Sequence, residues 1–345
     1  MDSCKTLLVT GGAGFIGGNF ARYMLETHAD MAIVNFDALT YAGNLESLAD
    51  LENNPRYAFV KGSVADKAAV ERLFAEHRFD AVAHFAAETH VDRSLTDAEL
   101  FIETNALGTQ RLLDAARAHG VKRHVQISTD EVYGSLGPQG EFTEASPIQP
   151  NNPYAASKAA ADFLVRAAFK THKLETVITR CSNNFGPFQF PEKLIPLMIA
   201  NALEDKPLPV YGDGLHVRDW LYVLDHCSAI DAVLHKGKPG EIYNIGGHKD
   251  VPNIEVVRTL LGILGKPESL IRHVQDRPGH DRRYAMDSTK IRQELGWEPA
   301  HNFEDALRRT VEWYLDNRAW QERARSGAYQ DYYKTMYEER LVNAS

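Results

Sequence analysis

Cysteine is scarce in this sequence of 345 residues. The three cysteines, Cys4, Cys181 and Cys227, include no CxxC pair, which excludes a disulfide framework and the usual spacing of a zinc site. We therefore expect no bound metal. This sparse use of cysteine is typical of a protein that works in the reducing cytoplasm.

Long apolar segments and an excess of positive charge are also missing. No apolar run approaches the roughly 18 residues that a membrane-spanning helix requires, and MDSCK leads directly into TLLVT without a signal-peptide hydrophobic region. The formal net charge of -9 argues against binding of nucleic acid or of an anionic membrane. A phosphate-bearing small molecule is still compatible with this charge, because local arginines and helix N-termini can outweigh it.

The composition itself is that of a soluble globular protein, with 44% hydrophobic and 25% charged residues. Short apolar runs alternate with helical segments through the first half. The predicted strands cover Thr6–Thr10, Ala32–Asp37, Tyr57–Lys61, Ala81–Phe85 and His124–Ser128. The predicted helices cover Phe15–Thr27, Lys67–His77, Phe101–His119 and Pro153–His172. This alternation predicts an α/β fold with a doubly wound parallel sheet of the Rossmann type.

The second half differs in texture, because proline and glycine cluster between short predicted elements, as in residues 185–191 and 207–214. The segment EIYNIG at residues 241–246 is suited to a strand that returns to the main sheet. We expect a first domain over residues 1–182, to which later segments such as 215–250 return. A smaller, interleaved and discontinuous domain would consist mainly of residues 183–345.

A glycine-rich turn joins the first predicted strand to the first predicted helix, in the segment TGGAGFIG. Gly11, Gly14 and Gly17 allow a tight turn, close approach of the backbone to a pyrophosphate and close packing of helix on strand. The free amide groups at the helix N-terminus would face the phosphates. The pattern predicts a dinucleotide-binding turn, although a glycine turn alone also occurs in purely structural settings.

Asp37, at the end of the second predicted strand, makes this interpretation more specific. It follows Gly17 by twenty residues, where a carboxylate can accept hydrogen bonds from both ribose hydroxyls. A 2′-phosphate would be repelled there, and no arginine stands at position 38 or 39, so NAD is favoured over NADP. The alternatives are that Asp37 is only a turn residue and that Ser63, a weaker candidate for an adenine contact, is a plain loop serine.

Tyr154 and Lys158 stand four residues apart in PYAASKAAADFLV, at a predicted helix start. This spacing places both side chains on one helical face. An ammonium group beside a phenol favours the phenolate, so we expect the pKa of Tyr154 to be lowered from its reference of about 10. Such a tyrosine can remove a hydroxyl proton as hydride leaves the same carbon. The alternative is a surface pair on an amphipathic helix.

Thr129, Asp130 and Glu131 follow the fifth predicted strand, where doubly wound sheets bind their ligands. A simple oxidoreductase needs no adjacent pair of carboxyl groups. Loss of water across two carbons, in contrast, needs a base for a carbon acid and an acid for the departing hydroxyl. The pair therefore indicates a dehydratase, and the alternative is that both acids only cap a helix N-terminus.

Several segments match one family over nearly the whole chain: TGGAGFIG, NFDALTYAGNLESL, HFAAETHVDRS, FIETNALGT, STDEVYG, PYAASKAAAD, SNNFGPFQFPEKLIPL, VYGDGLHVRDWLYV and DRPGHDRRYAMD. In these segments the sequence resembles the dTDP-glucose 4,6-dehydratases of the extended short-chain dehydrogenase/reductase class. STDEVYG is typical of dehydratases rather than epimerases, and RDWLYV and RPGHDRRYA are typical of the thymidine-nucleotide branch. The resemblance implies NAD in the first domain, a nucleotide-sugar in the second, and a homodimer formed through the helices at 101–119 and 153–172.

The resemblance also implies a reaction. Tyr154 would remove the proton of the sugar C4 hydroxyl, held by Thr129, while NAD⁺ takes the C4 hydride. Glu131 would then remove the C5 proton, and Asp130 would protonate the C6 hydroxyl as it leaves. Hydride returns to C6 to give a 4-keto-6-deoxy sugar, and Lys158 would bind the nicotinamide ribose.

Further contacts are expected from the glycine turn and the resemblance together. Those with NAD would come from Gly11, Gly14, Phe15, Ile16, Gly17, Asp37, Ala38, Leu39, Thr40, Ser63, Val64, Phe85, Ala86, Ala87, Thr104, Tyr154, Lys158 and Asn184. Those with the nucleotide-sugar would come from Thr89, Thr129, Asn183, Lys193, Leu194, Pro209, Val210, Tyr211, Arg218, Asn253, Arg277 and His280. Arg218 and Arg277 would clamp the diphosphate, unless Arg218 forms a structural ion pair with Asp219 or Asp225.

Two positions depart from the family pattern. Thr89 replaces a commoner serine but keeps the hydroxyl, whereas Ser63 replaces the usual aspartate and puts the adenine contact in doubt. A UDP-sugar dehydratase or epimerase on the same fold is the first alternative, because the base pocket around residues 193–211 is not resolved by sequence. A non-catalytic NAD-binding scaffold protein is the alternative from another class, and the complete catalytic set argues against it.

Overall fold

The computed structural model describes residues 4–276 and 280–325. Its centre is a seven-stranded sheet with the strand order β10-β6-β5-β4-β1-β2-β3, in which all neighbours are parallel. These strands are β1 Thr6–Thr10, β2 Ala32–Asp37, β3 Tyr57–Lys61, β4 Ala81–His84, β5 Arg123–Thr129, β6 Glu175–Cys181 and β10 Ile242–Ile245. The predicted doubly wound parallel sheet is thus confirmed. The strand order reverses between β1 and β4, which opens a crevice at the carboxyl ends of the strands.

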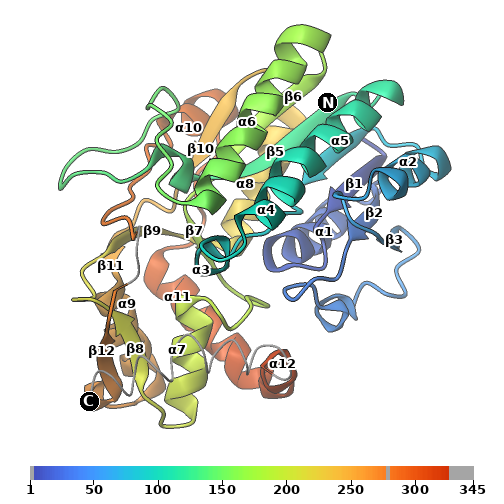
Figure 1. The fold of residues 1–345 in the computed structure, drawn as a ribbon. Coiled ribbons are helices and arrows are strands. Elements are labelled where there is room, and N and C mark those ends of the chain that lie inside the picture. Colours follow the sequence, from blue (N-terminus) through green and yellow to red (C-terminus); the bar gives the residue numbers. More distant parts are fainter. Residues whose placement is uncertain (1–3, 277–279, 326–345) are drawn as a thin grey trace.

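Helices cover both faces of this sheet (Figure 1). One face packs against α1 Phe15–Thr27, α8 Val223–Lys236 and α10 Thr289–Leu295. The other packs against α2 Lys67–Glu76, α5 Gly108–Ala118 and α6 Pro153–His172. Strand β1 shows why the layers form, because Leu7 and Val9 point into the first core and Leu8 into the second. Among the described residues, no helix is both long and apolar enough to cross a membrane.

A second group of elements lies beside the sheet, at the lower left of Figure 1. It contains a three-stranded sheet, β7 Asn183–Phe185, β9 Val217–Tyr222 and β11 Asp250–Pro252, and a two-stranded one, β8 Leu208–Tyr211 and β12 Ile271–Val274. Its helices are α7 Leu194–Leu203, α9 Asn253–Leu264, η4 Glu268–Leu270, α11 Phe303–Asp316 and α12 Arg318–Ala324. The fully buried Phe185 lies in their shared core. Between β9 and β11 the chain returns to the main sheet through α8 and β10.

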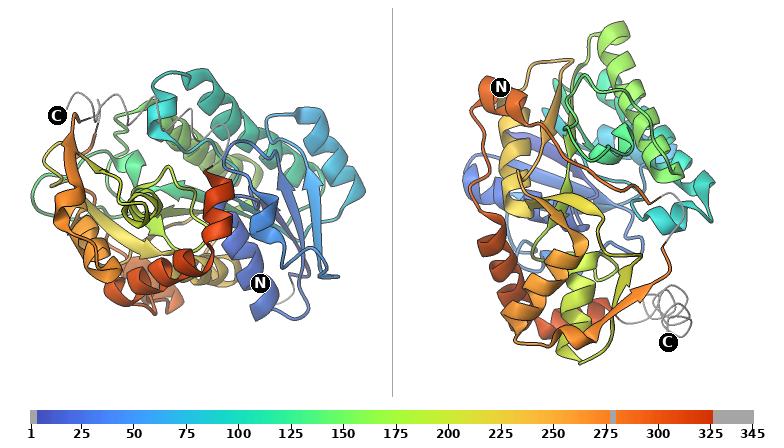
Figure 2. Two further views of the ribbon diagram at one scale, coloured as in Figure 1. Left: turned by 90° about the horizontal axis from the view of Figure 1, so that it is seen from below. Right: turned by 90° about the vertical axis from the view of Figure 1, so that its left-hand side faces the viewer.

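The two groups also meet at their edges. Figure 2 (left) shows α12 against the N-terminal part of the chain, near the short helix η1 Leu45–Leu48. There Trp320 donates from Nε1 to Oγ of Ser47 at 3.1 Å, and Arg323 pairs with Glu46 at 2.6 Å. These contacts connect the end of the second group to the first half of the chain.

Short helical segments follow the carboxyl ends of β4 and β5. They are α3 Val91–Ser94, α4 Ala98–Phe101, the π-helix η2 Ile102–Leu107 and the 3₁₀-helix η3 Asp130–Tyr133. The predicted helix over Phe101–His119 is thus present as one helical run, but in its first half a π-helical turn widens the backbone. Asn105 in this turn bonds both backbone groups of Glu88 and the hydroxyl of Ser157, and these contacts favour the wider turn.

Candidate active site

A cavity of about 510 Å³ opens at the carboxyl ends of the central strands. Its near wall is the glycine turn after β1 together with the ends of β2, β4 and β5, and its far wall is formed by α7, β8 and β9. The cavity thus lies where the strand order reverses and reaches into the second group of elements. Both the predicted cofactor residues and the predicted substrate residues border it.

The glycine turn brings the backbone close to the cavity floor. Gly11 has φ +72°, and a Cβ there would lie 2.5 Å from the backbone nitrogen of Ala86. A Cβ on Gly17 would lie 2.4 Å from the carbonyl oxygen of Gly11, so neither position accepts a side chain. Helix α1 begins after Gly14 without a side-chain cap, which leaves its first amide groups available to a phosphate.

Asp37 is held at the edge of this turn by two backbone amides. Its Oδ2 accepts from the amide of Ala13 at 2.9 Å, and its Oδ1 accepts from the amide of Leu39 at 2.7 Å. Burial raises the pKa of Asp37 above its ordinary value of 3.8, although both hydrogen bonds act against this. Each carboxylate oxygen keeps a second lone pair, so the group can still accept from a ribose diol.

The two adjacent acids have unequal environments. Thr129 caps η3 by accepting from the amide of Glu131 at 3.2 Å and donates to Oδ1 of Asp130 at 3.2 Å. Asp130 is 2% exposed, and among the described residues its Oδ2 has no hydrogen-bond partner. Glu131 is more exposed, and its Oε2 accepts from Asn152 at 3.4 Å. Because Thr129 caps η3, neither carboxyl group is needed as the helix cap, and both can act on a ligand in the cavity.

Burial and the charge of Glu131 raise the pKa of Asp130 well above its ordinary 3.8, which favours the protonated form. The prediction that the pKa of Tyr154 is lowered is wrong when only the groups of the protein act on the phenol. Burial, and then the charge of Glu131, raise that pKa well above 10. Lys158 is itself buried, its pKa is lowered, and its ammonium donates to the carbonyl of Ile127 at 2.7 Å. Desolvation and a carboxylate therefore outweigh the ammonium at the phenol.

Polar residues of the second group form the far wall. Asn183 carries a buried Oδ1 with no hydrogen-bond partner among the described residues, and Lys193 donates to the carbonyl of Thr89 at 3.4 Å. The guanidinium of Arg218 donates to the carbonyl of Asp281 at 2.9 Å and lies 4.4 Å from the ring centroid of Tyr284. These contacts fix the positions of an amide, an ammonium and a guanidinium along one wall.

The two acids considered as partners of Arg218 are engaged elsewhere. Asp219 accepts from the backbone amides of Gly247 and Lys249, at 3.0 and 3.2 Å. Asp225 accepts from the backbone of His301 at 3.2 Å, and its Oδ1 lies 2.9 Å from Nδ1 of the same histidine. Both carboxylates thus accept hydrogen bonds from backbone amides, Asp219 from the loop before β11 and Asp225 from the segment just before α11.

Of the predicted site residues that the structure describes, all but Leu39 and Val210 border the cavity. Leu39 packs its side chain against the first core and contributes only its backbone near Asp37. Val210 is 1% exposed and points into the core of the second group, because it lies in a strand between Pro209 and Tyr211, which face the cavity. Arg277 lies outside the described residues. The assignments of Leu39, Val210 and Arg277 as contact residues remain predictions.

Two buried carboxyl groups in the cavity wall were missed by the sequence analysis. Burial raises the pKa of Glu192 to about 7, and burial also raises that of Glu88. Glu192 is 4% exposed, and its Oε1 lies 3.5 Å from the hydroxyl of Tyr41. The segment FPEKLIPL contains Glu192, but nothing in its letters shows that this glutamate is buried beside the cavity.

The fold and this site define a nicotinamide-dependent enzyme of the extended short-chain dehydrogenase/reductase class. The family model described as GDP-mannose 4,6 dehydratase matches residues 8–310. A dTDP-glucose 4,6-dehydratase of Neisseria meningitidis serogroup B is 54% identical over 346 aligned positions, which cover 94% of this chain and 97% of the relative.

Solved structures agree with these relatives. The dTDP-glucose 4,6-dehydratase of Streptomyces venezuelae, crystallised with NAD and TYD bound, superposes with a TM-score of 0.89 at 50% identity. The enzyme of the same name from Bacillus anthracis, in complex with NAD, gives 0.87 at 50% identity. Each comparison covers 92% of this chain and 99% of the other. The chain belongs to the dTDP-glucose 4,6-dehydratase family, which confirms the resemblance seen in its sequence.

Proposed function

We propose that the chain converts dTDP-glucose into dTDP-4-keto-6-deoxyglucose and water, with Thr129, Asp130, Glu131, Tyr154 and Lys158 as its catalytic residues. NAD is the cofactor, which when bound accepts hydride from C4 of the sugar and returns it to C6. The observation that carries the proposal is the pair of adjacent carboxyl groups, one deeply buried and one more exposed, in one cavity with Tyr154. Elimination of water needs such an unequal pair, whereas simple oxidation does not.

The oxidation step falls to the residues on β5 and α6. Tyr154 accepts the proton of the C4 hydroxyl, and Thr129 holds the same oxygen through its own hydroxyl. Lys158 orients the nicotinamide ribose, because the hydrogen bond to Ile127 fixes its ammonium within the cavity wall. Burial and Glu131 raise the pKa of Tyr154, so positive charge near the phenol, such as that of Lys158, favours its deprotonation.

The elimination step falls to the two acids. Glu131 removes the C5 proton, which the neighbouring C4 ketone has made acidic. Asp130 gives its proton to the C6 hydroxyl, and the burial that raises its pKa favours the protonated form needed for this step. The proton donor, Asp130, is thus the more buried of the two acids, and the proton acceptor, Glu131, is the more exposed.

The far wall is proposed to hold the nucleotide. Asn183, Lys193 and Arg218 supply amide, ammonium and guanidinium donors for the diphosphate and its flanking groups. Thr89, Leu194, Pro209, Tyr211, Asn253 and His280 complete the proposed pocket. In this division residues 1–182 form the NAD-binding domain, segments within 215–250 return to it, and the rest binds the nucleotide-sugar.

A homodimer is proposed through α5, α6 and the segments that precede α5. Large apolar side chains are exposed along this face: Leu100 at 42%, Ile102 at 53%, Leu107 at 49% and Phe163 at 56%. In Figure 1 α5 and α6 run side by side on the outer face of the sheet. A second copy that presents the same two helices would cover these side chains in a four-helix interface.

Substrate choice gives the direct test of the proposed function. The purified full chain is incubated separately with dTDP-glucose and UDP-glucose, and the 4-keto product is followed by its absorbance in alkali. Product from dTDP-glucose, with little from UDP-glucose, supports the proposal. Product from UDP-glucose alone, or an epimerised sugar without a ketone, would replace it with one of the related activities.

A further inference from the structure

Three side chains with metal-binding atoms gather at the end of α1 opposite the active site. They are His28, which follows α1, and Asp231 and His235, which lie on α8. Helix α1 has 13 residues, so its last turn is about 20 Å from the glycine turn at its start. None of the three residues borders the cavity, and the proposed reaction does not use them.

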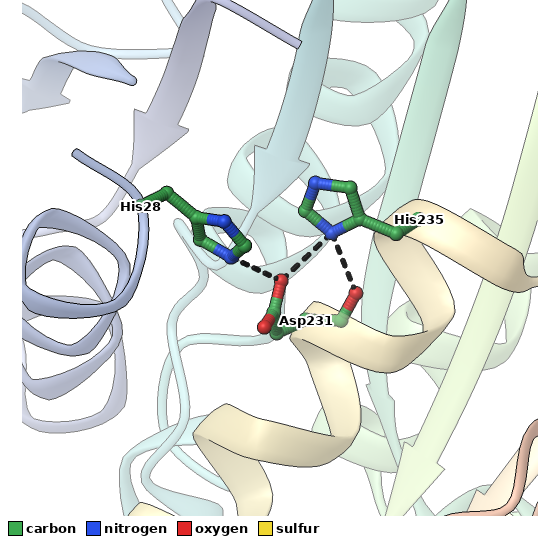
Figure 3. A group of neighbouring side chains, drawn as sticks. All are labelled: His28, Asp231 and His235. Carbon is green, nitrogen blue, oxygen red and sulfur yellow. Dashed lines mark hydrogen bonds and ion pairs between the residues drawn. The ribbon is translucent and has the colours of Figure 1, made fainter. Parts of the chain in front are cut away.

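Both imidazole rings are directed at one oxygen of the same carboxylate (Figure 3). Nε2 of His28 lies 2.9 Å from Oδ1 of Asp231, and Nδ1 of His235 lies 2.8 Å from the same atom. The two rings are stacked, with centroids 4.8 Å apart and planes inclined by 29°. All three ligand atoms lie within 4.8 Å of one another.

The backbone holds these side chains before any ligand binds. The amide of His28 donates to the carbonyl of Met24 at 2.9 Å, and its carbonyl accepts from Arg56 at 2.7 Å. Asp231 and His235 stand one turn apart on α8, so both face α1. Helices α1 and α8 pack on the same face of the main sheet and share its first core. Two of the ligands therefore lie on one helix, and the third directly follows another helix that packs on the same face of the sheet.

We propose that His28, Asp231 and His235 bind a divalent transition-metal cation, best matched by Zn²⁺, which links the end of α1 to α8. Two imidazole nitrogens and one carboxylate oxygen suit zinc, cobalt or nickel, whereas magnesium and calcium prefer oxygen ligands. Zinc bonds of 2.0–2.2 Å in a tetrahedron place ligand atoms roughly 3.3 Å apart. The two nitrogen–oxygen separations of 2.9 and 2.8 Å are somewhat shorter than this, so small rotations of the side chains are enough to admit an ion.

Charge and exposure are also compatible with an ion. The carboxylate of Asp231 lies between the two imidazole rings and would supply the anionic ligand. The side chains of His28, Asp231 and His235 are 29%, 15% and 23% exposed. This partial exposure gives an ion access from solvent and leaves room for a water molecule as the fourth ligand.

The competing interpretation is a hydrogen-bonded His–Asp–His cluster that binds no metal. Cobalt distinguishes the two, because Co²⁺ held by nitrogen and oxygen ligands in a tetrahedral site absorbs strongly in the visible range. The full chain with its retained nucleotide is treated with a chelator, dialysed and titrated with Co²⁺, and then with Zn²⁺ as competitor. We expect one equivalent to give visible bands that Zn²⁺ removes, and a melting temperature that rises with Zn²⁺ concentration.

Variants assign the site. His28→Gln and Asp231→Asn should each weaken the affinity for this equivalent by at least about 10-fold. His77→Gln is the matched control, since His77 is likewise partly exposed and likewise ends a helix, α2, with its amide on the carbonyl four residues before. A second set of possible ligands, His216, Asp276 and His280, includes the cavity residue His280 and could bind metal separately. The variants are therefore expected to lose one equivalent of bound Co²⁺ relative to wild type, not all of it.

Folding and activity are checked on the same samples. Each variant is compared with wild type by circular dichroism and by its retained nucleotide, and turnover should not depend on Zn²⁺ because the site is remote from the cavity. A wild-type chain without visible cobalt bands would overturn the proposal. So would equal loss of binding in His28→Gln and His77→Gln.

Discussion

Lys158 and Ile127 are joined by a hydrogen bond of 2.7 Å from the buried ammonium to the carbonyl oxygen at the end of β5. The bond anchors the lysine in the cavity wall close to Tyr154, one turn earlier on α6. Burial lowers the pKa of Lys158, and the nearby Asp162 acts against that change. The ammonium is thus kept where it can act on both the phenol and the cofactor.

Lys158→Met should therefore impair the oxidation step. Burial and Glu131 already raise the pKa of Tyr154. Removal of a positive charge one helical turn away should raise it further. We expect turnover to fall by about 10²- to 10⁴-fold. The pH profile of NADH formation in a single turnover should move to higher pH. Lys158→Arg keeps the charge and should recover part of the loss; an unchanged profile in Lys158→Met would show that the lysine only positions the ribose.

The second prediction is that Asp37 determines the preference for NAD over NADP. Asp37→Ala removes the acceptor for the ribose hydroxyls and should weaken NAD binding about 10- to 100-fold, since hydrogen bonds to charged groups contribute about 1.5–3 kcal/mol. The measurement is the amount and identity of nucleotide released when the purified protein is denatured. Wild-type protein should release NAD. Release of mainly NADP, or equal NAD retention in Asp37→Ala, would contradict the ribose assignment.

Regular hydrophobic patterns explain why some predictions from sequence succeeded. Period-two and helical patterns place whole elements, so strands β1 to β5 and the 20-residue helix α6 match their predicted ranges closely. Strand β6 of the same sheet was not predicted. Tyr154 and Lys158 were found because both lie on one helix. In contrast, the π-helical turn at Ile102–Leu107 depends on contacts of Asn105 with residues 17 and 52 positions away. No local pattern reports such contacts.

Side-chain direction and long-range proximity account for the rest. Val210 was assigned to the nucleotide pocket with its neighbours, but alternation along β8 turns it into the core. His28 and Asp231 are 203 residues apart, and so their cluster has no spacing signature. The burial of Glu192 likewise follows from its contacts with Tyr41 and His90 in the first half of the chain, which the segment alone does not show.

The exposed face of α5 and α6 leads to the third prediction. Light scattering of the wild-type chain should give twice the mass of one chain. Phe163→Glu should shift it toward one chain, because a charge replaces a 56%-exposed ring at the proposed interface. Leu315→Glu, at a 38%-exposed position on α11, is the control and should leave the dimer intact. A concentration-independent monomer in the wild type would refute the interface.

Glu192 provides a pH-dependent stability test. Its pKa of about 7 lies above the 4.5 of an ordinary glutamate, so its contribution to stability is fully present below about pH 4.5 and is lost as pH rises through 7. Glu192→Gln mimics the protonated form and should raise the free energy of unfolding above pH 7 by up to about 3 kcal/mol. Urea unfolding at pH 5 and pH 8 measures the difference. An equal effect at both values would exclude titration of this group.

The last prediction separates oxidation from elimination. Glu131→Gln keeps the shape of the side chain but removes the C5 base, whereas Tyr154→Phe removes the C4 base. In a single turnover, Glu131→Gln should still accumulate bound NADH, visible by its absorbance, while exchange of the C5 proton with solvent deuterium stops. Tyr154→Phe should form no NADH. Both losses should reach about 10² to 10⁴ in overall rate, the usual contribution of a positioned acid or base.

Asp130→Asn completes the test, because its carboxyl group is the proposed proton donor to the leaving hydroxyl. This variant should retain both NADH formation and C5 exchange while loss of water slows. Circular dichroism and retained nucleotide show whether each variant keeps its fold. The three variants then block three different steps of one reaction. If Glu131→Gln instead behaves like wild type in both assays, the acids after β5 do not divide the elimination between them, and another base must reach C5.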